Sequence, residues 1–407
     1  MKQIKYLFGS MLIIALIPLI VVAYPQPRKT TSHKFDKPIL TGADQTSLYV
    51  SYLKGKNVGM VVNQTSIIGK NKTASPDSLL KLGVKIKKIF GPEHGFRGNA
   101  SNGAAVGNEV DTKTGVPVIS LYGSKHYKPT VDELKGIDLM IFDIQDVGTR
   151  FYTYISTLHY IMEACAENNI VLMVLDRPNP NGTIIDGPIL DSAYKSFVGM
   201  HPIPISHGMT IAEYTQMING EGWLKNHVQC KLKIIKLTNY THAATYVLPV
   251  NPSPNLNTNQ SILLYPSTCL FEGTTFSLGR GTMLPFVQIG HPLLKGKYSF
   301  SFTPVSIAGM SEDPPQKNQV CYGIDLRNFN TDGLKKSGKI NLSWLINLYK
   351  IFPDKAHFFN AYFTKLAGTE ELRKQIEAGK TEAEIRQSWT VGLSKYKATR
   401  RKYLLYP

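Results

Sequence analysis

Residues 139–175, LMIFDIQDVGTRFYTYISTLHYIMEACAENNIVLMVL, decide the fold. The segment opens with the apolar run Leu139–Asp143 and closes with Ile170–Leu175, each of the length of a strand. Between them, residues from about Thr153 to Asn168 have the length and composition of a helix. Near-continuous apolar strands separated by helices are typical of a parallel sheet covered on both faces. The segment therefore predicts a strand–helix–strand unit.

The same alternation continues on both sides of this unit. Ser75-Pro76-Asp77 has the pattern of a helix start, and the pattern Thr130-x-x-Glu133 predicts a capping box. The further predicted helices are Ser75 to about Gly83, Thr130 to about Gly136 and Thr210–Asn219; the further strands are Val58–Val62, Val84–Phe90, Val116–Leu121 and Lys231–Leu237, the last as an edge strand. We predict a doubly wound, mostly parallel α/β domain over residues 38–265. No GxGxxG follows the first strand, so a dinucleotide site has no support.

The remainder of the chain has a different composition. At 407 residues the protein exceeds the size at which a single core stops growing, so two domains are expected. Residues 266–330 are rich in Gly, Pro and Thr, whereas 340–407 look helical, with a capping-box pattern at Thr381 and Glu384. We predict a smaller α+β domain over residues 266–407 that completes a cleft.

Composition and charge narrow the class of protein. With 43% hydrophobic and 18% charged residues, the chain suits a globular protein. Its net charge of +17 is compatible with nucleic acid, an anionic membrane or an acidic polymer such as cell-wall glycan. The positive charge is spread along the chain without a nucleic-acid motif, so we predict no nucleic-acid partner. The scattered Cys165, Cys230, Cys269 and Cys321 exclude the usual zinc patterns, and a disulfide among the last three stays open.

The N-terminus has the pattern of an export signal. Lys2 and Lys5 precede an apolar stretch, and Val21 and Ala23 supply small residues at the −3 and −1 positions of a cleavage site. We predict a signal peptide at residues 1–23, a linker at 24–37, and a periplasmic, envelope or extracellular location. An uncleaved anchor is the alternative.

Polar and charged side chains follow several predicted strands, at the point where each strand ends. Ligands of open α/β sheets bind beyond the carboxyl ends of the strands, so these side chains are candidates for one polar cleft. The break at Gly91-Pro92 delivers two of them, an acid beside an imidazole. The candidates are Asn63, Glu93, His94, Arg97, Asp143, Gln145, Asp146, Arg150, Asp176, Arg177, Asn179 and Asn181.

Some of these residues also have a structural interpretation. Asp143 and Asp176 are suited to capping loops, and Arg150 and Arg177 to pairing with those acids. Glu213 is expected on a solvated helix face.

A metal site is a further alternative, since it needs three or four ligands. The chain has no HExxH, and neighbouring Glu and His side chains do not easily reach one ion, so we predict neither metal nor cofactor. GxSxG and P-loop motifs are also absent from the sequence. The side chains that would supply metal ligands are Glu93, His94, Asp143, Asp176 and His207.

Several longer motifs resemble one bacterial family, the exo-β-N-acetylmuramidases, which hydrolyse peptidoglycan. The resemblance runs from about Leu53 to the C-terminus. It rests on FGPEHGFRG (90–98), FDIQDVGTRFYTYI (142–155), LDRPNPNG (175–182), HGMTIAEY (207–214), NPSPNL (251–256), YPSTCLFEGTTFSLGRGT (265–282) and RRKYLLYP (400–407).

This resemblance implies a Rossmann-like N-terminal domain and removal of terminal N-acetylmuramic acid from the non-reducing end of cell-wall glycan. It implies Glu93 as the catalytic residue, which fits the need of glycoside hydrolysis for an acid. For the second group we expect Asp143 or Asp176, with Asp146 behind them, or the substrate's own acetamide.

The remaining candidates are expected to bind the sugar. A guanidinium suits the lactyl carboxylate of muramic acid, and the candidates are Arg97, Arg150 and Arg280. Tyr152 and Phe96 are expected to stack on the sugar, or else to belong to the core. The other predicted binding residues are Asn63, His94, Gln145, Asp146, Arg177 (or as a brace for Asp176), Asn179, His207 and Glu272. Two other functions stay open: a non-catalytic cell-wall glycan-binding protein, and a metal-dependent hydrolase or deacetylase.

Overall fold

The computed structural model describes residues 37–97, 109–123 and 127–407. The chain divides into two units, Met1–Lys37 and Pro38–Pro407, and the following paragraphs concern the second. The predicted signal peptide and almost all of the linker lie outside the described residues. None of the helices in the described ranges combines the length and apolar composition needed to cross a bilayer.

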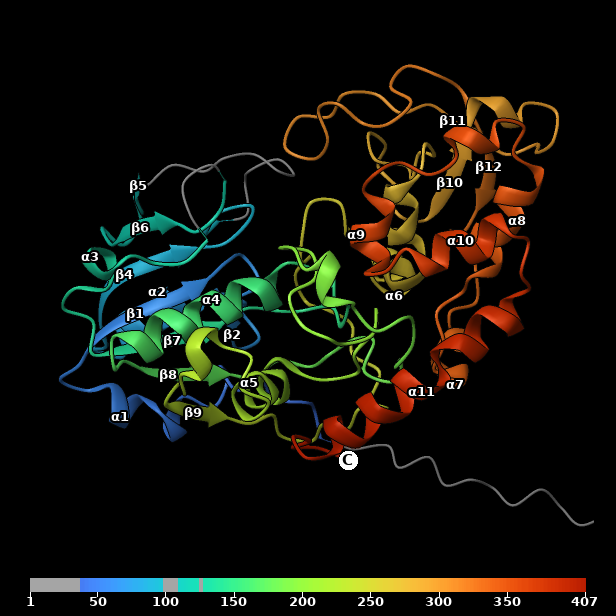
Figure 1. The fold of residues 1–407 in the computed structure, drawn as a ribbon. Helices are drawn as coiled ribbons and strands as arrows, with labels where there is room; N and C mark the ends of the chain where they lie inside the picture. The colour runs from blue at the N-terminus through green and yellow to red at the C-terminus, as the bar shows by residue number, and fades with distance from the viewer. Residues whose placement is uncertain (1–36, 98–108, 124–126) are drawn as a thin grey trace, which may run out of the picture. The chain divides into compact units, whose positions relative to one another are not determined.

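The described residues of the first half form a seven-stranded sheet in the order β5-β6-β4-β1-β7-β8-β9 (Figure 1). Neighbouring strands run parallel, except that β5 pairs antiparallel with β6 at one edge. The predicted mostly parallel sheet is confirmed, and β9 lies at the other edge as predicted. The bounds are β1 Asn57–Val62, β4 Lys85–Gly91, β5 Glu109–Val110, β6 Pro117–Ser120, β7 Leu139–Asp143, β8 Val171–Leu175 and β9 Leu232–Ile235.

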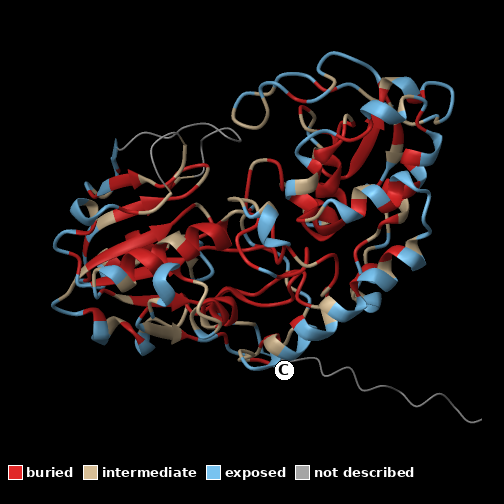
Figure 2. Ribbon diagram, in the orientation of Figure 1, coloured by how far each residue is buried: buried red, intermediate tan, exposed pale blue. Residues whose placement is uncertain are grey.

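The sheet is buried because its central strands are apolar on both faces. Every residue of β7 is buried (Figure 2). Met140 and Phe142 belong to the hydrophobic cluster that includes α4 and α5, whereas Leu139 and Ile141 belong to a second cluster on the other face. Successive side chains of a strand point to opposite faces, so one apolar run supplies both cores.

The helices of this half are α1 Val50–Leu53, α2 Ser75–Lys81, α3 Val131–Leu134, α4 Tyr154–Glu167 and α5 Ile211–Gly220. The predicted capping box of α3 is present, and α5 has one formed by Thr210 and Glu213. The prediction that Glu213 lies on a solvated face is wrong. Its side chain is fully buried, because it caps α5 and also accepts hydrogen bonds from the ring of His242 and the backbone N–H of Leu405. A small hairpin of β2 Ile67–Ile68 and β3 Thr73–Ala74 was not predicted, since strands of this length carry no periodicity.

The second half contains an antiparallel sheet in the order β10-β12-β11, surrounded by helices, as predicted for an α+β region. The capping box predicted at Thr381 and Glu384 opens α11. The predicted domain boundary at 265/266 lies inside α6 and stays a prediction. The bounds are β10 Gln288–His291, β11 Ser301–Phe302, β12 Cys321–Asp325, α6 Asn259–Thr268, α7 Asp332–Ser337, α8 Ser343–Ile351, α9 Phe363–Ala367, α10 Glu371–Glu377 and α11 Glu382–Arg401.

The end of the chain returns to the first half. The Tyr396 hydroxyl in α11 donates to the His207 carbonyl at 2.7 Å, and the Tyr406 hydroxyl donates to Asp176 at 2.6 Å. These buried contacts fix α11 and the C-terminal tail against the sheet. The four cysteines, all among the described residues, are buried free thiols.

Candidate active site

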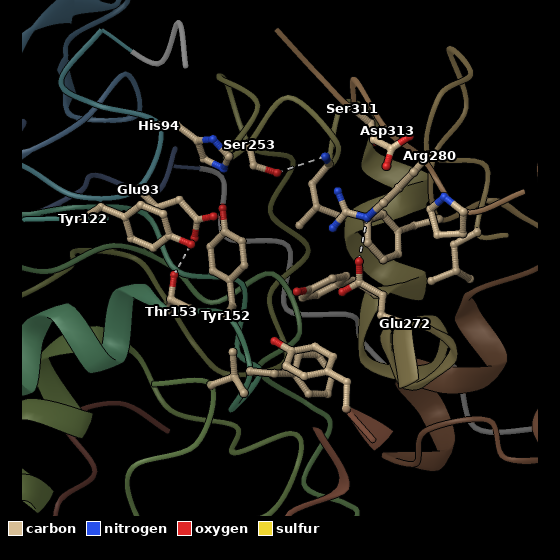
Figure 3. Close-up of a pocket in the computed structure, with 18 of the residues that line it drawn as sticks. Glu93, His94, Tyr122, Tyr152, Thr153, Ser253, Glu272, Arg280, Ser311 and Asp313 are labelled. Carbon is tan, nitrogen blue, oxygen red and sulfur yellow. Dashed lines mark hydrogen bonds and ion pairs between the residues drawn. The ribbon is translucent and has the colours of Figure 1, made fainter. Parts of the chain in front are cut away.

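A cavity of about 360 Å³ lies beyond the carboxyl ends of β4 and β6. The first half of the chain contributes the turn after β4, the residue Tyr122 after β6 and the segment that leads into α4. The second half contributes Glu272, Arg280, Asp313 and Tyr362. In Figure 3 Glu93 and Tyr122 lie on one side of the cavity and Arg280 on the other. The cavity therefore has an acidic wall from one half and a mixed-charge wall from the other.

Glu93 reaches the cavity because the chain turns sharply after β4. His94 and Gly95 both have left-handed backbones, with φ of 69° and 74°. The Gly95 N–H donates to the Pro92 carbonyl at 2.9 Å and closes the turn. Such a conformation is unfavourable for a residue with a side chain, and it persists where the surrounding structure enforces it. The turn holds the Glu93 backbone at the end of the sheet and points its side chain into the cavity (Figure 3).

Hydroxyl groups surround the Glu93 carboxylate. The Thr153 hydroxyl donates to Glu93 Oε2 at 3.0 Å; although Thr153 stands at the N-cap of α4, its side chain does not cap the helix. Burial, followed by the charge of Glu93 and a hydrogen bond to it, raises the pKa of Tyr122. Burial and the charge of Glu93 also raise the pKa of Tyr154. The two phenols therefore stay protonated at neutral pH.

The opposite wall is built around an ion pair. Arg280 Nε donates to Glu272 Oε1 at 2.6 Å, and the Cys269 thiol donates to the other Glu272 oxygen at 3.4 Å. The Arg280 guanidinium lies 5.0 Å from the centroid of the Phe286 ring. Burial lowers the pKa of Arg280, but the charge of Glu272 outweighs burial, so the pKa of Arg280 is raised. The Arg280 Nη1 atom is buried and has no hydrogen-bond partner within the described ranges, so it is a ready donor for an anion.

Glycines fix the backbone on both sides of this arginine. Gly279 and Gly281 have φ of 74° and 77°, in the region that favours glycine. A Cβ at Gly281 would also collide with the Val305 carbonyl and the ring of Pro314. The motif LGRGT therefore sets the position of Arg280.

Aromatic rings form the floor of the cavity. The Tyr265 ring meets Phe151 edge-on at 5.3 Å and Phe286 at 5.0 Å, and Tyr152 lies 5.9 Å from it. Tyr152 thus lines the cavity as predicted for a stacking residue. Phe96 does not: it is 2% exposed and belongs to the core on the other face of the sheet.

The two aspartates predicted as catalytic do not line the cavity formed by the described residues. Asp143 is fully buried and accepts from Arg177 Nε at 2.7 Å. Asp176 accepts from the Tyr406 hydroxyl and from the Ala212 N–H at 3.0 Å. Both carboxylates therefore have structural partners, and the Arg177 side chain braces Asp143 rather than Asp176.

The three arginines predicted to bind the lactyl carboxylate lie in three different environments. Arg150 is fully buried, and its guanidinium donates to four backbone carbonyls, two in each half of the chain. Arg97 pairs with Asp111 at 2.8 Å, outside the cavity. Of the three arginines predicted to bind the lactyl carboxylate, all within the described ranges, Arg280 alone lines the cavity.

Of the other predicted binding residues, some line the cavity and the rest are buried away from it. His94 and Glu272 line the cavity. The rest form a buried polar network that holds the strand-end loops: the Gln145 amide donates to the Pro178 carbonyl at 2.6 Å, and Asp146 accepts from the Gly148 N–H at 2.7 Å. The members of this network are Asn63, Gln145, Asp146, Asn179, Asn181 and His207.

Sequence reasoning missed several residues that line the cavity. Thr153 looked like the start of a helix, and Tyr122 follows a strand whose end was not counted as part of the rim. Asp313 lies in a loop without a motif, so nothing in the sequence marked it. Among the described residues no group of three or more His, Cys, Asp or Glu is placed to hold a metal ion.

A carboxyl group that faces a guanidinium across an aromatic-floored cavity suits carbohydrate hydrolysis, and similarity to known proteins puts the chain among the glycoside hydrolases. The chain belongs to the exo-β-N-acetylmuramidase NamZ family: the model of the N-terminal part matches residues 58–260 and that of the C-terminal part matches residues 263–406. A relative from Bacillus subtilis (strain 168), peptidoglycan β-N-acetylmuramidase NamZ, is 40% identical over 94% of this chain and 95% of its own length.

Two solved structures share the fold. Both are DUF1343 family proteins from Bacteroides fragilis NCTC 9343, and each match covers 91% of this chain and 99% of the other. One is 46% identical with a TM-score of 0.83, and the other is 28% identical with a TM-score of 0.76.

Proposed function

We propose that the protein removes terminal N-acetylmuramic acid from the non-reducing end of peptidoglycan fragments, with Glu93 as the general acid. The observation that carries the proposal is the placement of the Glu93 carboxyl and the Arg280 guanidinium on facing walls of one cavity. The name of the Bacillus subtilis relative, a peptidoglycan β-N-acetylmuramidase, supports the same substrate class.

Glu93 is suited to deliver a proton to the glycosidic oxygen. Glycoside hydrolysis needs a carboxylic acid at the leaving oxygen, held in place as the bond breaks. Glu93 is partly buried, and Thr153 fixes one of its oxygens at 3.0 Å. The neighbouring phenol of Tyr122 keeps its proton, so it stabilises the carboxylate that remains after proton transfer.

Arg280 is suited to recognise the lactyl group. Muramic acid differs from glucosamine by a lactyl ether whose carboxylate is the anion that the site must select. Nη1 of Arg280 is buried and lacks a protein partner among the described residues, while Glu272 holds the Nε side. An arginine with one edge fixed and one donor open binds a carboxylate with defined orientation.

Two routes remain for the opposite face of the sugar. Both Glu272 oxygens are engaged by Arg280 and Cys269, and the Asp313 side chain is 93% exposed at the rim. A water activated by Asp313 would invert the anomeric centre, whereas attack by the substrate's acetamide would retain it. NMR of the sugar as it is released distinguishes these routes.

The proposal includes export from the cytoplasm. It is supported by the signal pattern of residues 1–23 and by the location of peptidoglycan outside the cytoplasmic membrane. Expression of the full chain in a bacterium, followed by fractionation and N-terminal sequencing, tests it. Cytoplasmic protein that retains residue 1 would contradict it.

Hydrolysis of the disaccharide of N-acetylmuramic acid β-1,4-linked to N-acetylglucosamine, followed by chromatography of the released sugars, tests the reaction. Glu93→Gln should lower kcat by about 10²–10⁴-fold, the usual contribution of a general acid, whereas Glu371→Gln at an exposed position of α10 should leave it unchanged. Activity close to wild type in Glu93→Gln would refute the assignment. Muropeptide binding without turnover by the wild type would favour a glycan-binding protein, and loss of activity in EDTA would favour a metal-dependent hydrolase.

A further inference from the structure

Four aromatic rings contact one another in a cluster that reaches the cavity at Tyr122, on the Glu93 side. We name Tyr122, Tyr127, Tyr160 and Phe197 the aromatic ledge. Tyr127 and Phe197 stack at 4.0 Å with 18° between their planes, and Tyr160 stacks on Tyr127 at 6.1 Å with 16°. Tyr122 lies 6.1 Å from both Tyr127 and Phe197. The rings are therefore one continuous surface rather than isolated side chains.

The ledge begins where the cavity ends. Tyr122 belongs to both, because it lines the cavity and also contacts the Phe197 ring. Val198, the next residue after Phe197, lines the cavity as well. The Phe197 carbonyl accepts a hydrogen bond from the Ser156 hydroxyl in α4 at 2.7 Å, so the backbone that carries the ring is fixed.

Exposure separates these rings from those of the core. All four are partly exposed, whereas aromatic side chains such as Phe90, Phe142 and Tyr214 are completely buried. Adjacent apolar rings that stay in contact with water are costly, and such patches on a folded protein mark binding surfaces.

The position of Glu93 determines which part of a substrate meets the ledge. A general acid sits at the oxygen between the departing sugar and the sugar that stays bound in the cavity. Arg280 stands on the far wall, where the proposed function places the muramic acid. Tyr122 lies beside Glu93, and its pKa is raised by burial and then by Glu93. A chain that leaves the cavity past Glu93 therefore passes over the ledge.

The charge near the ledge suits a neutral sugar. Lys128 follows Tyr127 and pairs with Glu163 at 3.2 Å and with Glu167 at 2.7 Å. Within the described part of the chain, these ion pairs neutralise the charge of Lys128, the cation next to Tyr127. Pyranose rings have an apolar C–H face that packs on aromatic rings, while an anionic group would gain little there.

We propose that the aromatic ledge is the subsite for the leaving group, where it holds the N-acetylglucosamine next to the scissile bond. This inference rests on the proposed function and extends it from the sugar in the cavity to its neighbour. It assigns Phe197 and Tyr127 as residues that set preference for an oligosaccharide over a simple muramoside.

Two substrates isolate the ledge. The disaccharide of N-acetylmuramic acid β-1,4-linked to N-acetylglucosamine reaches the ledge, whereas the methyl β-glycoside of N-acetylmuramic acid has too small a leaving group. For Phe197→Ala we expect kcat/KM on the disaccharide to fall about tenfold, mainly through KM, because the sugar loses an apolar contact. Hydrolysis of the methyl glycoside should stay within about twofold of wild type. Phe197→Leu, which keeps much of the buried volume, should show the same difference between the substrates.

A matched control is Tyr52→Ala, which removes a ring that is 38% exposed and packed with lysines near β9, away from the cavity. It should change neither substrate. An equal fall on both substrates in Phe197→Leu, or no fall on the disaccharide, would overturn the inference while the proposed function stands. An effect restricted to muramic acid that carries a stem peptide would assign the ledge to the peptide and also overturn it. A wild-type protein that cleaves neither substrate would instead refute the proposed function.

Discussion

Replacement of Asp176 by Asn separates a catalytic from a structural role for this residue. Asp176 is fully buried and accepts hydrogen bonds from the Tyr406 hydroxyl and the Ala212 N–H. Burial raises its pKa from the ordinary value of 3.8 to about 7, despite these donors, and the nearby charge of Glu213 contributes in the same direction. The folded protein therefore holds a proton on Asp176 at pH values where the unfolded chain has lost it.

The sign of the pH dependence follows from proton binding. Between pH 4 and pH 7 the folded state binds one more proton at this site than the unfolded state, so the free energy of unfolding falls as pH rises. The stabilisation is complete below the unfolded pKa of 3.8 and is lost as pH passes the folded pKa of about 7. A difference of roughly 3 pH units at 1.36 kcal/mol each gives about 4 kcal/mol. The asparagine side chain in Asp176→Asn does not ionise, so the free energy of unfolding of this variant should not fall with pH through this site.

Urea unfolding at pH 4, 6 and 8 measures the effect. The free energy of unfolding of Asp176→Asn, relative to wild type, should rise by up to about 4 kcal/mol from pH 4 to pH 8. Asp132→Asn, at an exposed position of α3, is the control and should follow the wild-type profile. Parallel profiles for wild type and Asp176→Asn would refute the argument. A fall of more than about 100-fold in muramoside hydrolysis by a stably folded Asp176→Asn would return this residue to the catalytic group.

Three further substitutions test the site and its support. Thr153→Val removes the hydroxyl that holds Glu93 and should lower kcat about tenfold without a change in melting temperature, whereas Thr153→Ser should retain activity. Arg280→Gln should raise KM for a muramoside by at least about tenfold and leave hydrolysis of the corresponding glucosaminide at its low wild-type level, as steady-state kinetics on both substrates would show. Arg150→Met leaves four buried carbonyls without their donor and should lower the free energy of unfolding by about 3 kcal/mol or more in urea.

The fold was predictable because apolar runs specify buried strands directly. The strand predicted at Leu139–Asp143 has the bounds of β7, and the helix predicted from about Thr153 to Asn168 is α4 within one residue at each end. By contrast β5 contains two residues and is exposed, so neither periodicity nor hydrophobicity marks it. Local sequence patterns predict buried strands and helix ends, but they do not predict short exposed strands such as β5.

The candidate site was predictable only in part, because strand ends carry two kinds of polar residue. Glu93 and Asp176 look alike in the sequence: each follows an apolar strand and precedes a turn. Glu93 and Asp176 differ in which part of the distant chain lies against each carboxyl group. The C-terminal tail brings Tyr406 to Asp176 across 230 positions, whereas the second half leaves a cavity beside Glu93. No local pattern contains that information.

Buried polar residues at the strand ends also connect the two halves of the chain that form the cavity. Arg150 binds the carbonyls of Leu366 and Ala367 at 3.0 and 2.6 Å, and thereby ties the loop before α4 to the second half. Asp176 ties the sheet to the C-terminal tail through Tyr406. Because Glu93 and Arg280 belong to different halves, their separation depends on such ties rather than on either half alone. A site that must span one sugar needs that separation constant, since a small displacement of a catalytic group lowers the rate sharply. Arg150, predicted to bind substrate, and Asp176, predicted as catalytic, thus contact structural partners that connect the two halves of the chain.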